Sequence, residues 1–407
     1  MRVLLVLLGC AALSMLAGCG SNDKITNPVD PAAAEQLAQQ GDQALVAGDY
    51  AGANLLYKSA LTKDPAHERA NLGAAVTELA LLESDPEITP IIESLDPSFL
   101  PAPLRGGPVL RSPSGARAAA LGGGRRYGPM LMGRALGRLV LQGTADPEVF
   151  SDVQDVIRRR VLPRLIYAEA RLDRLELDPG FVLWLPPALT GGPDTIEVDL
   201  GEVRMLDAFV NVVQGWLGIA IAYDFDIPEP GALVPLDSLL SPGTGFGRLN
   251  SQGAATLAAA RLDFLSSHAE LHAAADFIAN ETDDQADDAI PQAALENPDF
   301  DAILAEFDNA QASLTGPVDV VVQDYLGADL TIQVRLGNFF TSPITDWKLK
   351  LPDHTFDAGT GDLVVTDPIT FPDPTFNGIF PNLTNTIWRQ LVGPVGGPAG
   401  AARASLR

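Results

Sequence analysis

Residues 203–223 (VRMLDAFVNVVQGWLGIAIAY) are the most apolar stretch of the chain beyond its N-terminus, and they constrain the fold more than any other segment. The stretch is long enough to cross a membrane as a helix. On a helix, however, Asp207, Asn211 and Gln214 recur at positions i, i+4 and i+7, so they form one polar stripe. Because a charged side chain inside a membrane is costly, we expect a core helix of a folded domain rather than a membrane span.

Helices are also predicted on both sides of this segment. The apolar periodicity of a helix appears in residues 149–177, 250–280 and 298–314. Pro163 is expected to kink the first of these helices, because proline disrupts the hydrogen bonding of a helix interior. Two short apolar runs, 181–185 and 195–200, are separated by turn residues and predict a β-hairpin. The sequence therefore predicts a mainly α fold with a large helical domain over residues 129–315.

The segments that flank this domain differ from it in composition. Residues 101–128 are rich in Gly, Pro and Arg and predict a linker. Residues 316–392 alternate short β-like runs with turns, which predicts a small β-containing or irregular segment. The expected strands are residues 318–322, 330–334 and 363–366. The tail 393–407 is rich in Gly, Pro and Ala, and we expect it to be flexible.

The first residues of the chain have the pattern of a secretory signal. Arg2 is followed by an apolar run that is short for a membrane span and ends in small residues. The ending Leu16-Ala17-Gly18-Cys19 resembles the lipobox of bacterial lipoproteins. Residues 1–19 are therefore interpreted as a lipoprotein signal peptide, and residues 20–33 as a polar tether to the first folded segment.

The resemblance to lipoproteins implies that Cys19 carries acyl chains and becomes the first residue of the mature protein. Each buried methylene contributes about 0.8 kcal/mol to membrane binding, so several chains anchor a protein without a spanning helix. Gly20 follows the cysteine, which in Gram-negative lipoproteins favours export to the outer membrane. The implied location is the cell envelope, on the periplasmic face of the outer membrane of a Gram-negative bacterium.

Residues 34–65 predict two helices joined by a turn at Gly48-Asp49, because apolar and small residues recur at i, i+3 and i+4 in both halves. Six residues have the spacing of the tetratricopeptide-repeat signature: Leu37, Gly41, Ala53, Tyr57, Ala60 and Pro65. The hairpin therefore resembles one tetratricopeptide unit, and residues 68–83 resemble the first helix of a second unit. For the region 34–100, this resemblance implies either a structural helical hairpin or a surface that binds a protein partner.

Charge and cysteine content exclude several classes of protein. The chain of 407 residues has a formal net charge of −25 at pH 7, which repels nucleic acid, so no nucleic-acid partner is expected. Cys10 lies within the signal segment, which leaves the lipidated Cys19 as the one cysteine of the mature protein. We therefore expect no disulfide, no thiol nucleophile and no cysteine metal site.

Two segments contain residue types that bind metals. His268 and His272 lie one helical turn apart in HAELH, but a zinc protease needs His-Glu-x-x-His, so we favour two histidines at a helix interface over a metal site. The acidic cluster that follows this helix offers weak candidates for calcium: Asp283, Asp284, Asp287 and Asp288. It lacks the ligand spacing of an EF-hand, and a solvated turn is the simpler interpretation. No other cofactor is expected.

The sequence contains no nucleophile elbow and no phosphate-binding loop, and an enzyme is not expected. The favoured function is a non-catalytic scaffold or adaptor that holds a protein partner at the membrane. A binding lipoprotein for an apolar ligand or calcium is the second hypothesis, and a hydrolase that uses carboxylates is the third. An exposed apolar groove along residues 34–83 would favour the first, a deep apolar pocket within 129–315 the second, and converging acidic side chains in a cleft the third.

Overall fold

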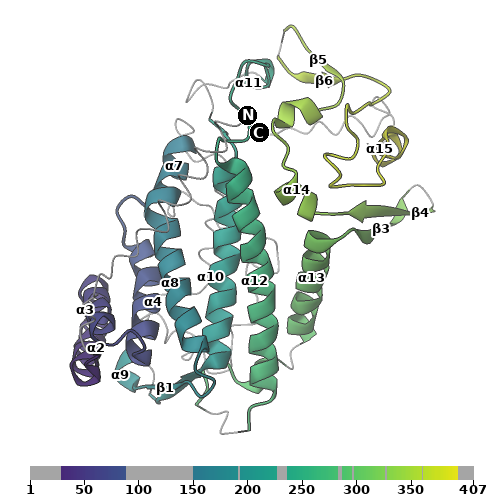
Figure 1. Cartoon of the computed structure of the whole chain (residues 1–407). Coiled ribbons are helices and arrows are strands. Elements are labelled where there is room, and N and C mark those ends of the chain that lie inside the picture. The colour runs from purple at the N-terminus through teal and green to yellow at the C-terminus, as the bar shows by residue number, and fades with distance from the viewer. Residues whose placement is uncertain are drawn as a thin grey trace, which may run out of the picture.

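The computed structural model describes residues 29–88, 150–190, 193–226, 236–282, 287–295, 298–325, 328–359 and 361–392. The segments predicted as signal (1–19), linker (101–128) and tail (393–407) lie outside these ranges, as do most of the predicted tether (20–33) and residues 89–100 and 129–149. The longer helices lie side by side in a row, and the C-terminal segment lies at one end of it (Figure 1). The predicted mainly α fold with small β elements is confirmed.

The row begins with the predicted helical hairpin. Helices α2 (Pro31–Val46) and α3 (Tyr50–Lys63) are joined by a turn in which Gly48 has a φ of +79°, a conformation that suits glycine. Asp30 and Asp49 cap the two helices, because each side chain accepts a hydrogen bond from a backbone N–H of the first turn. The cap residues and the glycine therefore fix where the two helices begin and how the chain reverses.

Tyr57 is the central side chain of this hairpin. Its ring is 1% exposed and lies between α2 and α4 (Glu68–Glu83). A Cβ atom added to Gly41 would lie 2.7 Å from a ring carbon, and one added to Gly73 would lie 2.5 Å from another. Both helices therefore approach the ring so closely that only glycine fits. The Tyr57 hydroxyl donates to the Asp42 carboxylate at 2.7 Å.

The partner of α4 comes from much later in the chain. Helix α8 (Leu162–Glu176) packs against α4 and follows α7 (Phe150–Val156) through a π-helical turn (Ile157–Val161). Pro163 has no N–H to donate, and its ring would clash with the carbonyl four residues earlier in a regular α-helix. The disruption predicted at Pro163 takes the form of this wider turn immediately before it.

Helix α10 (Leu200–Ala222) is the predicted core helix and lies between α8 and α12 (Gly253–Ala279). In the described part of the chain it is the one helix that is long and apolar enough to cross a membrane, and 67% of its most apolar window is buried inside the protein. The predicted hairpin leads into it: β1 (Val182–Leu185) pairs antiparallel with β2 (Ile196–Asp199). The chain thus turns back through this hairpin from α8 to α10.

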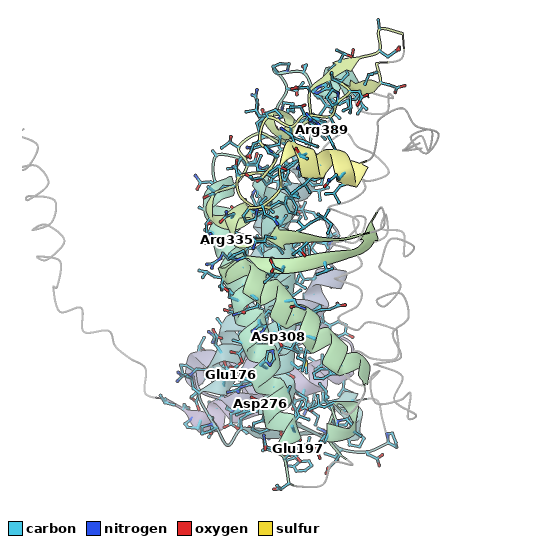
Figure 2. All side chains as sticks on the ribbon, turned by 90° about the vertical axis from the view of Figure 1, so that its right-hand side faces the viewer. Glu176, Glu197, Asp276, Asp308, Arg335 and Arg389 are labelled. Carbon is cyan, nitrogen blue, oxygen red and sulfur yellow. The ribbon has the colours of Figure 1, made fainter. Side chains whose placement is uncertain are left out.

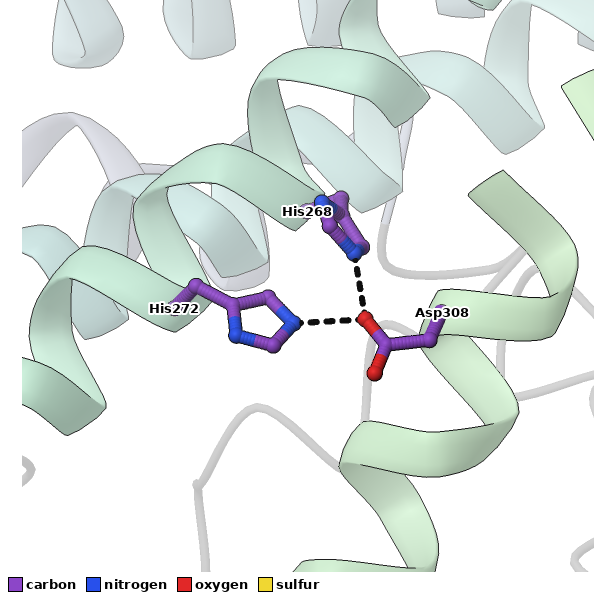
Figure 3. Close-up of side chains that lie close together, drawn as sticks. All are labelled: His268, His272 and Asp308. Atoms are coloured by element: carbon purple, nitrogen blue, oxygen red, sulfur yellow. Dashed lines mark hydrogen bonds and ion pairs between the residues drawn. The ribbon is translucent and has the colours of Figure 1, made fainter. Parts of the chain in front are cut away.

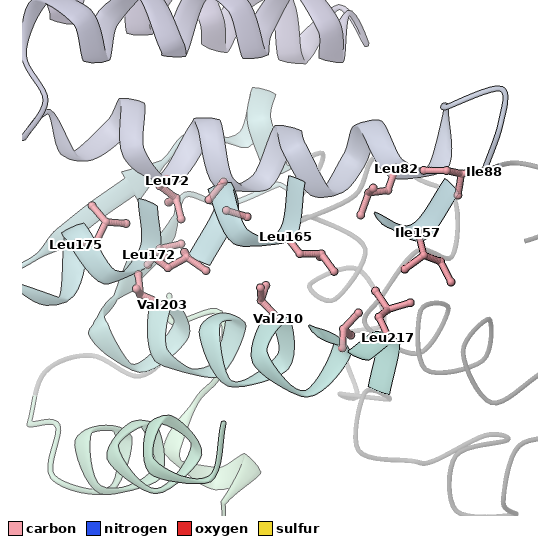
Figure 4. Packing of buried hydrophobic residues seen from close by; sticks show 14 of the residues in the cluster. Leu72, Leu82, Ile88, Ile157, Leu165, Leu172, Leu175, Val203, Val210 and Leu217 are labelled. Atoms are coloured by element: carbon pink, nitrogen blue, oxygen red, sulfur yellow. The ribbon is translucent and has the colours of Figure 1, made fainter. Parts of the chain in front are cut away.

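The main hydrophobic core lies between α4, α8 and α10 (Figure 4). Leu72 of α4, Leu165 and Leu172 of α8, and Val203 and Val210 of α10 are buried there. Aromatic residues make up only 6% of the chain, and this core is correspondingly aliphatic. Burial of each side chain of this kind contributes about 1.5–3 kcal/mol, so the core holds the three helices at fixed positions.

Helix α13 (Pro298–Thr315) packs against α12 and leads into the C-terminal segment. The strands of the C-terminal segment form two antiparallel pairs: β3 (Val318–Tyr325) with β4 (Ala328–Val334), and β5 (His354–Phe356) with β6 (Leu363–Val365). The three predicted strands are confirmed as β3, β4 and β6. The short helices are α9 (Pro187–Thr190), α11 (Leu236–Leu239), α14 (Gly337–Thr341) and α15 (Asn385–Val392), with 3₁₀ turns at Gln292–Ala294 and Trp347–Lys350.

Candidate cation-binding site

The polar stripe predicted on α10 is confirmed, and it is buried. Asp207, Asn211 and Gln214 are 2%, 1% and 5% exposed. A stripe of this kind costs free energy unless its polar atoms find partners on the neighbouring helices. We therefore ask which groups of the neighbouring helices face these three residues.

The two neighbouring helices contribute polar stripes of the same i, i+4, i+7 spacing. Together the three stripes form a layer that we call the acidic seam: Glu169, Asp173 and Glu176 on α8, Asp207, Asn211 and Gln214 on α10, and Asp263, Ser267 and Glu270 on α12. Six of these side chains are carboxylic acids. Neither flanking stripe was predicted from the sequence, where the apolar periodicity of both helices dominates the pattern.

At one end of the acidic seam, three carboxylates converge. Glu176, Asp207 and Glu270 each place an oxygen within 4.8 Å of the other two. Oxygen ligands lie about 2.3–2.6 Å from a bound Ca²⁺, so two ligands of one ion lie at most about 5 Å apart. The separation of the three carboxylates therefore fits a shared divalent cation.

Two of the buried polar side chains of α10 have oxygens without a hydrogen-bond partner among the described residues. They are Asp207 Oδ1 and Asn211 Oδ1. The other polar side-chain atoms of Asp207 and Asn211 are hydrogen-bonded: Asn211 Nδ2 donates to Asp207 Oδ2 at 3.1 Å and to the Asp207 carbonyl at 3.1 Å. Ser267 Oγ of α12, in a side chain that is 1% exposed, also lacks a partner in the described part of the chain. A buried oxygen in this state costs about 1–3 kcal/mol, which a bound cation would offset.

Arg204 is the cation nearest to the three carboxylates. Its Nε lies 3.9 Å from Glu176 Oε2 and 3.9 Å from Glu270 Oε2, which is too long for a hydrogen bond to either. The Arg204 side chain is 27% exposed, but its Nε is buried and has no hydrogen-bond partner among the described residues. Arg204 therefore reduces the negative charge of the site without saturating its oxygens.

The pKa values of these carboxyl groups reflect burial among like charges. Burial, followed by the charge of Glu176, raises the pKa of Asp207 to about 9. Burial and the neighbouring Glu270 carboxylate raise the pKa of Glu176 to about 7. Without a cation, the site therefore holds protons near neutral pH, and a divalent cation would compete with them.

The other end of the acidic seam is partly satisfied by hydrogen bonding. Gln214 Nε2 donates to Glu169 Oε2 at 2.6 Å. Burial, followed by the charge of Glu169, raises the pKa of Asp263 to about 7. Because the carboxylates converge more closely around Asp207, that end is the stronger candidate for a cation.

The calcium candidates predicted from the sequence are only partly described. Asp283 and Asp284 lie outside the described residues. Asp287 and Asp288 lie beside Glu197 of β2, and one carboxylate oxygen of each of the three is within 4.8 Å of the others. Glu197 lies near the lower ends of the helices, at the opposite end of the molecule from Arg389 of the C-terminal segment (Figure 2). The sequence did not predict the contribution of Glu197, because it is remote in the chain.

An apolar pocket of about 190 Å³ lies between α7, α10 and the C-terminal segment. Its lining includes Phe150, Tyr223, Phe225, Phe339 and Trp347. Pockets that enclose small molecules usually measure about 300–1,000 Å³. The pocket is therefore small for the apolar ligand that the sequence left open.

The predicted repeat-like residues pack within the N-terminal hairpin. Gly41, Ala53, Tyr57 and Ala60 are buried, Leu37 is half-buried, and Pro65 is exposed just after α3. The four buried residues therefore pack the helices against one another, and Pro65 follows the end of α3. Cys19 and the lipobox residues Leu16, Ala17 and Gly18 lie outside the described residues.

His268 and His272 lie on another face of α12 from Glu270, as predicted from their spacing. Both histidines face α13, where they contact Asp308. They take no part in the acidic seam.

Comparison with known proteins adds no family to this description. No family model, no curated protein and no solved structure matches the chain.

Proposed function

We propose that this protein is a lipid-anchored envelope protein whose helical domain binds a divalent cation that prefers oxygen ligands, with Ca²⁺ as the first candidate. The ligands are Glu176, Asp207 and Glu270. The observation that carries the proposal is Asp207: a carboxylate that is 2% exposed, has an oxygen without a partner among the described residues, and faces two further carboxylates.

The ligand chemistry supports a hard cation. Carboxylate and amide oxygens suit Ca²⁺, Mg²⁺ and Mn²⁺, whereas metals such as Cu⁺ prefer sulfur. The three carboxylates supply the charge, and Asn211 Oδ1 is an additional buried oxygen one helical turn from Asp207. The proposal therefore keeps calcium, one of the alternatives that the sequence left open, and moves it from the 283–288 cluster to the acidic seam.

A binding function agrees with the burial better than a carboxylate hydrolase does. A hydrolase needs space for its substrate beside the acid and the base. Asp207 is 2% exposed, and the Glu176 side chain is 14% exposed. A bare ion reaches such a position more readily than a polymeric or ester substrate.

The central test is titration calorimetry of the full-length protein in detergent with Ca²⁺, Mg²⁺ and Mn²⁺. We expect one of these ions to bind in the acidic seam. At a concentration about 100 times the dissociation constant, binding would stabilise the fold by about 2.7 kcal/mol, and the thermal midpoint of a chain of this length would rise by roughly 3–5 °C. D207N keeps the size of the side chain and should remove both the heat of binding and the rise.

The matched control is D276N. Asp276 lies on α12 like Glu270 but is exposed, so this variant makes the same charge change away from the acidic seam. It should bind the ion like the wild type. Binding that survives D207N, or a protein that none of the three ions binds or stabilises, would refute the proposed function.

The location rests on the N-terminal sequence and has a test of its own. If Cys19 is the lipidation site, cells fed radiolabelled palmitate should label the wild-type protein and not C19S. C19S should also leave the membrane fraction. Labelled C19S protein would contradict the anchor without bearing on the cation site.

The scaffold function suggested by the repeat-like residues stays a prediction. Gly41, Ala53, Tyr57 and Ala60 are buried and pack the hairpin, and such packing is required both by a structural hairpin and by a binding surface.

A further inference from the structure

Two histidines and one aspartate converge between α12 and α13 (Figure 3). His268 Nε2 and His272 Nε2 each lie 2.8 Å from the same oxygen, Asp308 Oδ1. The centroids of the two rings lie 4.5 Å apart, and the ring planes are tilted by 47° to one another. All three side chains therefore direct a metal-binding atom toward one point.

An interhelical hydrogen bond alone accounts poorly for this geometry. The side chains of His272 and Asp308 are 36% and 55% exposed, and solvent screens ion pairs at such exposure so strongly that they contribute little to stability. Asp308 Oδ1 can accept a hydrogen bond from both imidazoles only when both Nε2 atoms carry protons, because a deprotonated Nε2 at 2.8 Å would repel the carboxylate.

We infer that His268, His272 and Asp308 bind a divalent transition metal, with Zn²⁺ as the ion that suits the ligands best. Two histidines at i and i+4 on a helix present their rings on one face, as a shared metal requires. Zinc binds imidazole nitrogen and carboxylate oxygen at about 2.0–2.2 Å, so the ligand atoms of a tetrahedral site lie roughly 3.3–3.5 Å apart. The 2.8 Å contacts must therefore open by about 0.5–0.7 Å, which the exposed Asp308 side chain allows.

The site has three protein ligands and a solvent-facing side. A zinc ion with three protein ligands keeps a fourth position for water or another ligand. The ion would also link α12 to α13, the helix that leads into the C-terminal segment. This site differs from the acidic seam in its ligands, its face of α12 and its preferred metal, so either can fail without the other.

The test uses full-length D207N, which lacks the acidic-seam ligand, and Zn²⁺ alone as the probe. We expect one high-affinity Zn²⁺ per chain by titration calorimetry, and at least a hundredfold weaker binding after the further change H272Q. H354Q is the matched control, because it removes a histidine from the C-terminal segment and should bind Zn²⁺ normally. Co²⁺ as a second probe should give the visible absorption of a four-coordinate ion in D207N and H354Q and not in H272Q.

Two results would overturn the inference. The first is Zn²⁺ binding that H272Q leaves within threefold of its parent. The second is a lower thermal midpoint for H272Q in EDTA combined with no response of the parent to Zn²⁺, which would make the three residues an interhelical hydrogen bond only. Because His272 is partly exposed, H272Q should fold, and its circular dichroism spectrum checks this directly.

Discussion

At the scale of single residues, Arg204 sets how strongly the acidic seam attracts a cation. Its guanidinium lies 3.9 Å from two of the three carboxylates and competes with the ion for them. R204Q should therefore strengthen binding of the divalent ion by on the order of tenfold, or 1.4 kcal/mol. In EDTA the same variant should be less stable than the wild type, because the carboxylates then repel one another without compensation.

Calorimetric titration of R204Q beside R174Q checks this prediction. Arg174 is an exposed arginine of α8, so R174Q makes the same charge change farther from the three carboxylates. Equal affinities of the two variants would show that Arg204 does not compete with the ion.

Gly73 tests the close packing around Tyr57. Alanine in place of glycine inside a helix normally stabilises by about 0.5–1 kcal/mol. Here the new Cβ would lie 2.5 Å from the Tyr57 ring, and overpacking of this kind costs about 1–3 kcal/mol. The cost of the overlap with Tyr57 should exceed the gain from alanine in a helix. G73A should therefore unfold at a lower urea concentration than the wild type. G243A, where nothing lies within 4 Å of the new Cβ, should change the urea midpoint little; a stabilised G73A would contradict the packing around Tyr57.

At the scale of elements, the N-terminus of α10 is held by a capping box. The Asp199 side chain accepts a hydrogen bond from Gly201 N at 2.6 Å, and Glu202 Oε2 accepts one from Asp199 N at 3.0 Å. D199A should lower the free energy of unfolding by about 0.5–2 kcal/mol. D199N keeps an acceptor and should recover most of that loss in urea denaturation. Equal destabilisation by both variants would mean that the carboxylate, and not the cap, is what matters.

The elements themselves were largely predictable from the sequence, because each long helix carries its own apolar periodicity. The core helix over 203–223 and the hairpin over 181–200 depend on local patterns, and both are confirmed. The π-helical turn before Pro163 was predicted only as a kink, since sequence shows that a regular helix is broken but not which backbone geometry relieves the clash.

The candidate site was predictable only in part. The stripe of Asp207, Asn211 and Gln214 stands out because the surrounding helix is so apolar. Glu176 lies among other charged residues and Glu270 lies between two histidines, and nothing local distinguishes either from a residue on a solvated helix face. Their approach to Asp207 depends on how three helices pack, which a single helix pattern does not encode. The same holds for Asp308, which meets His268 and His272 only through the packing of α13 on α12.

At the scale of the whole molecule, the acidic seam makes stability depend on pH. The pKa values of Asp207, Glu176 and Asp263 are raised to about 9, 7 and 7, so between about pH 4 and pH 9 these three groups bind more protons in the folded protein than in the unfolded chain. Their contribution to the free energy of unfolding therefore falls as pH rises through this range. Other titrating groups also contribute to the dependence of stability on pH. The difference between the profiles of the wild type and D207N therefore isolates the contribution of Asp207.

Thermal unfolding in EDTA at steps from about pH 5 to about pH 9 measures this dependence. The wild type should lose stability toward high pH more steeply than D207N. Addition of the divalent ion at high pH should restore the stability of the wild type, because the bound ion replaces the protons that the carboxyl groups have lost. A wild-type profile parallel to that of D207N would contradict burial of an ionisable Asp207.

The most direct measurement of the central claim is the position of the ion itself. Crystals of the protein grown with Mn²⁺, which oxygen ligands bind well, should show an anomalous difference peak between Glu176, Asp207 and Glu270. A map with no peak there, in crystals where Mn²⁺ is bound elsewhere or not at all, would contradict the account.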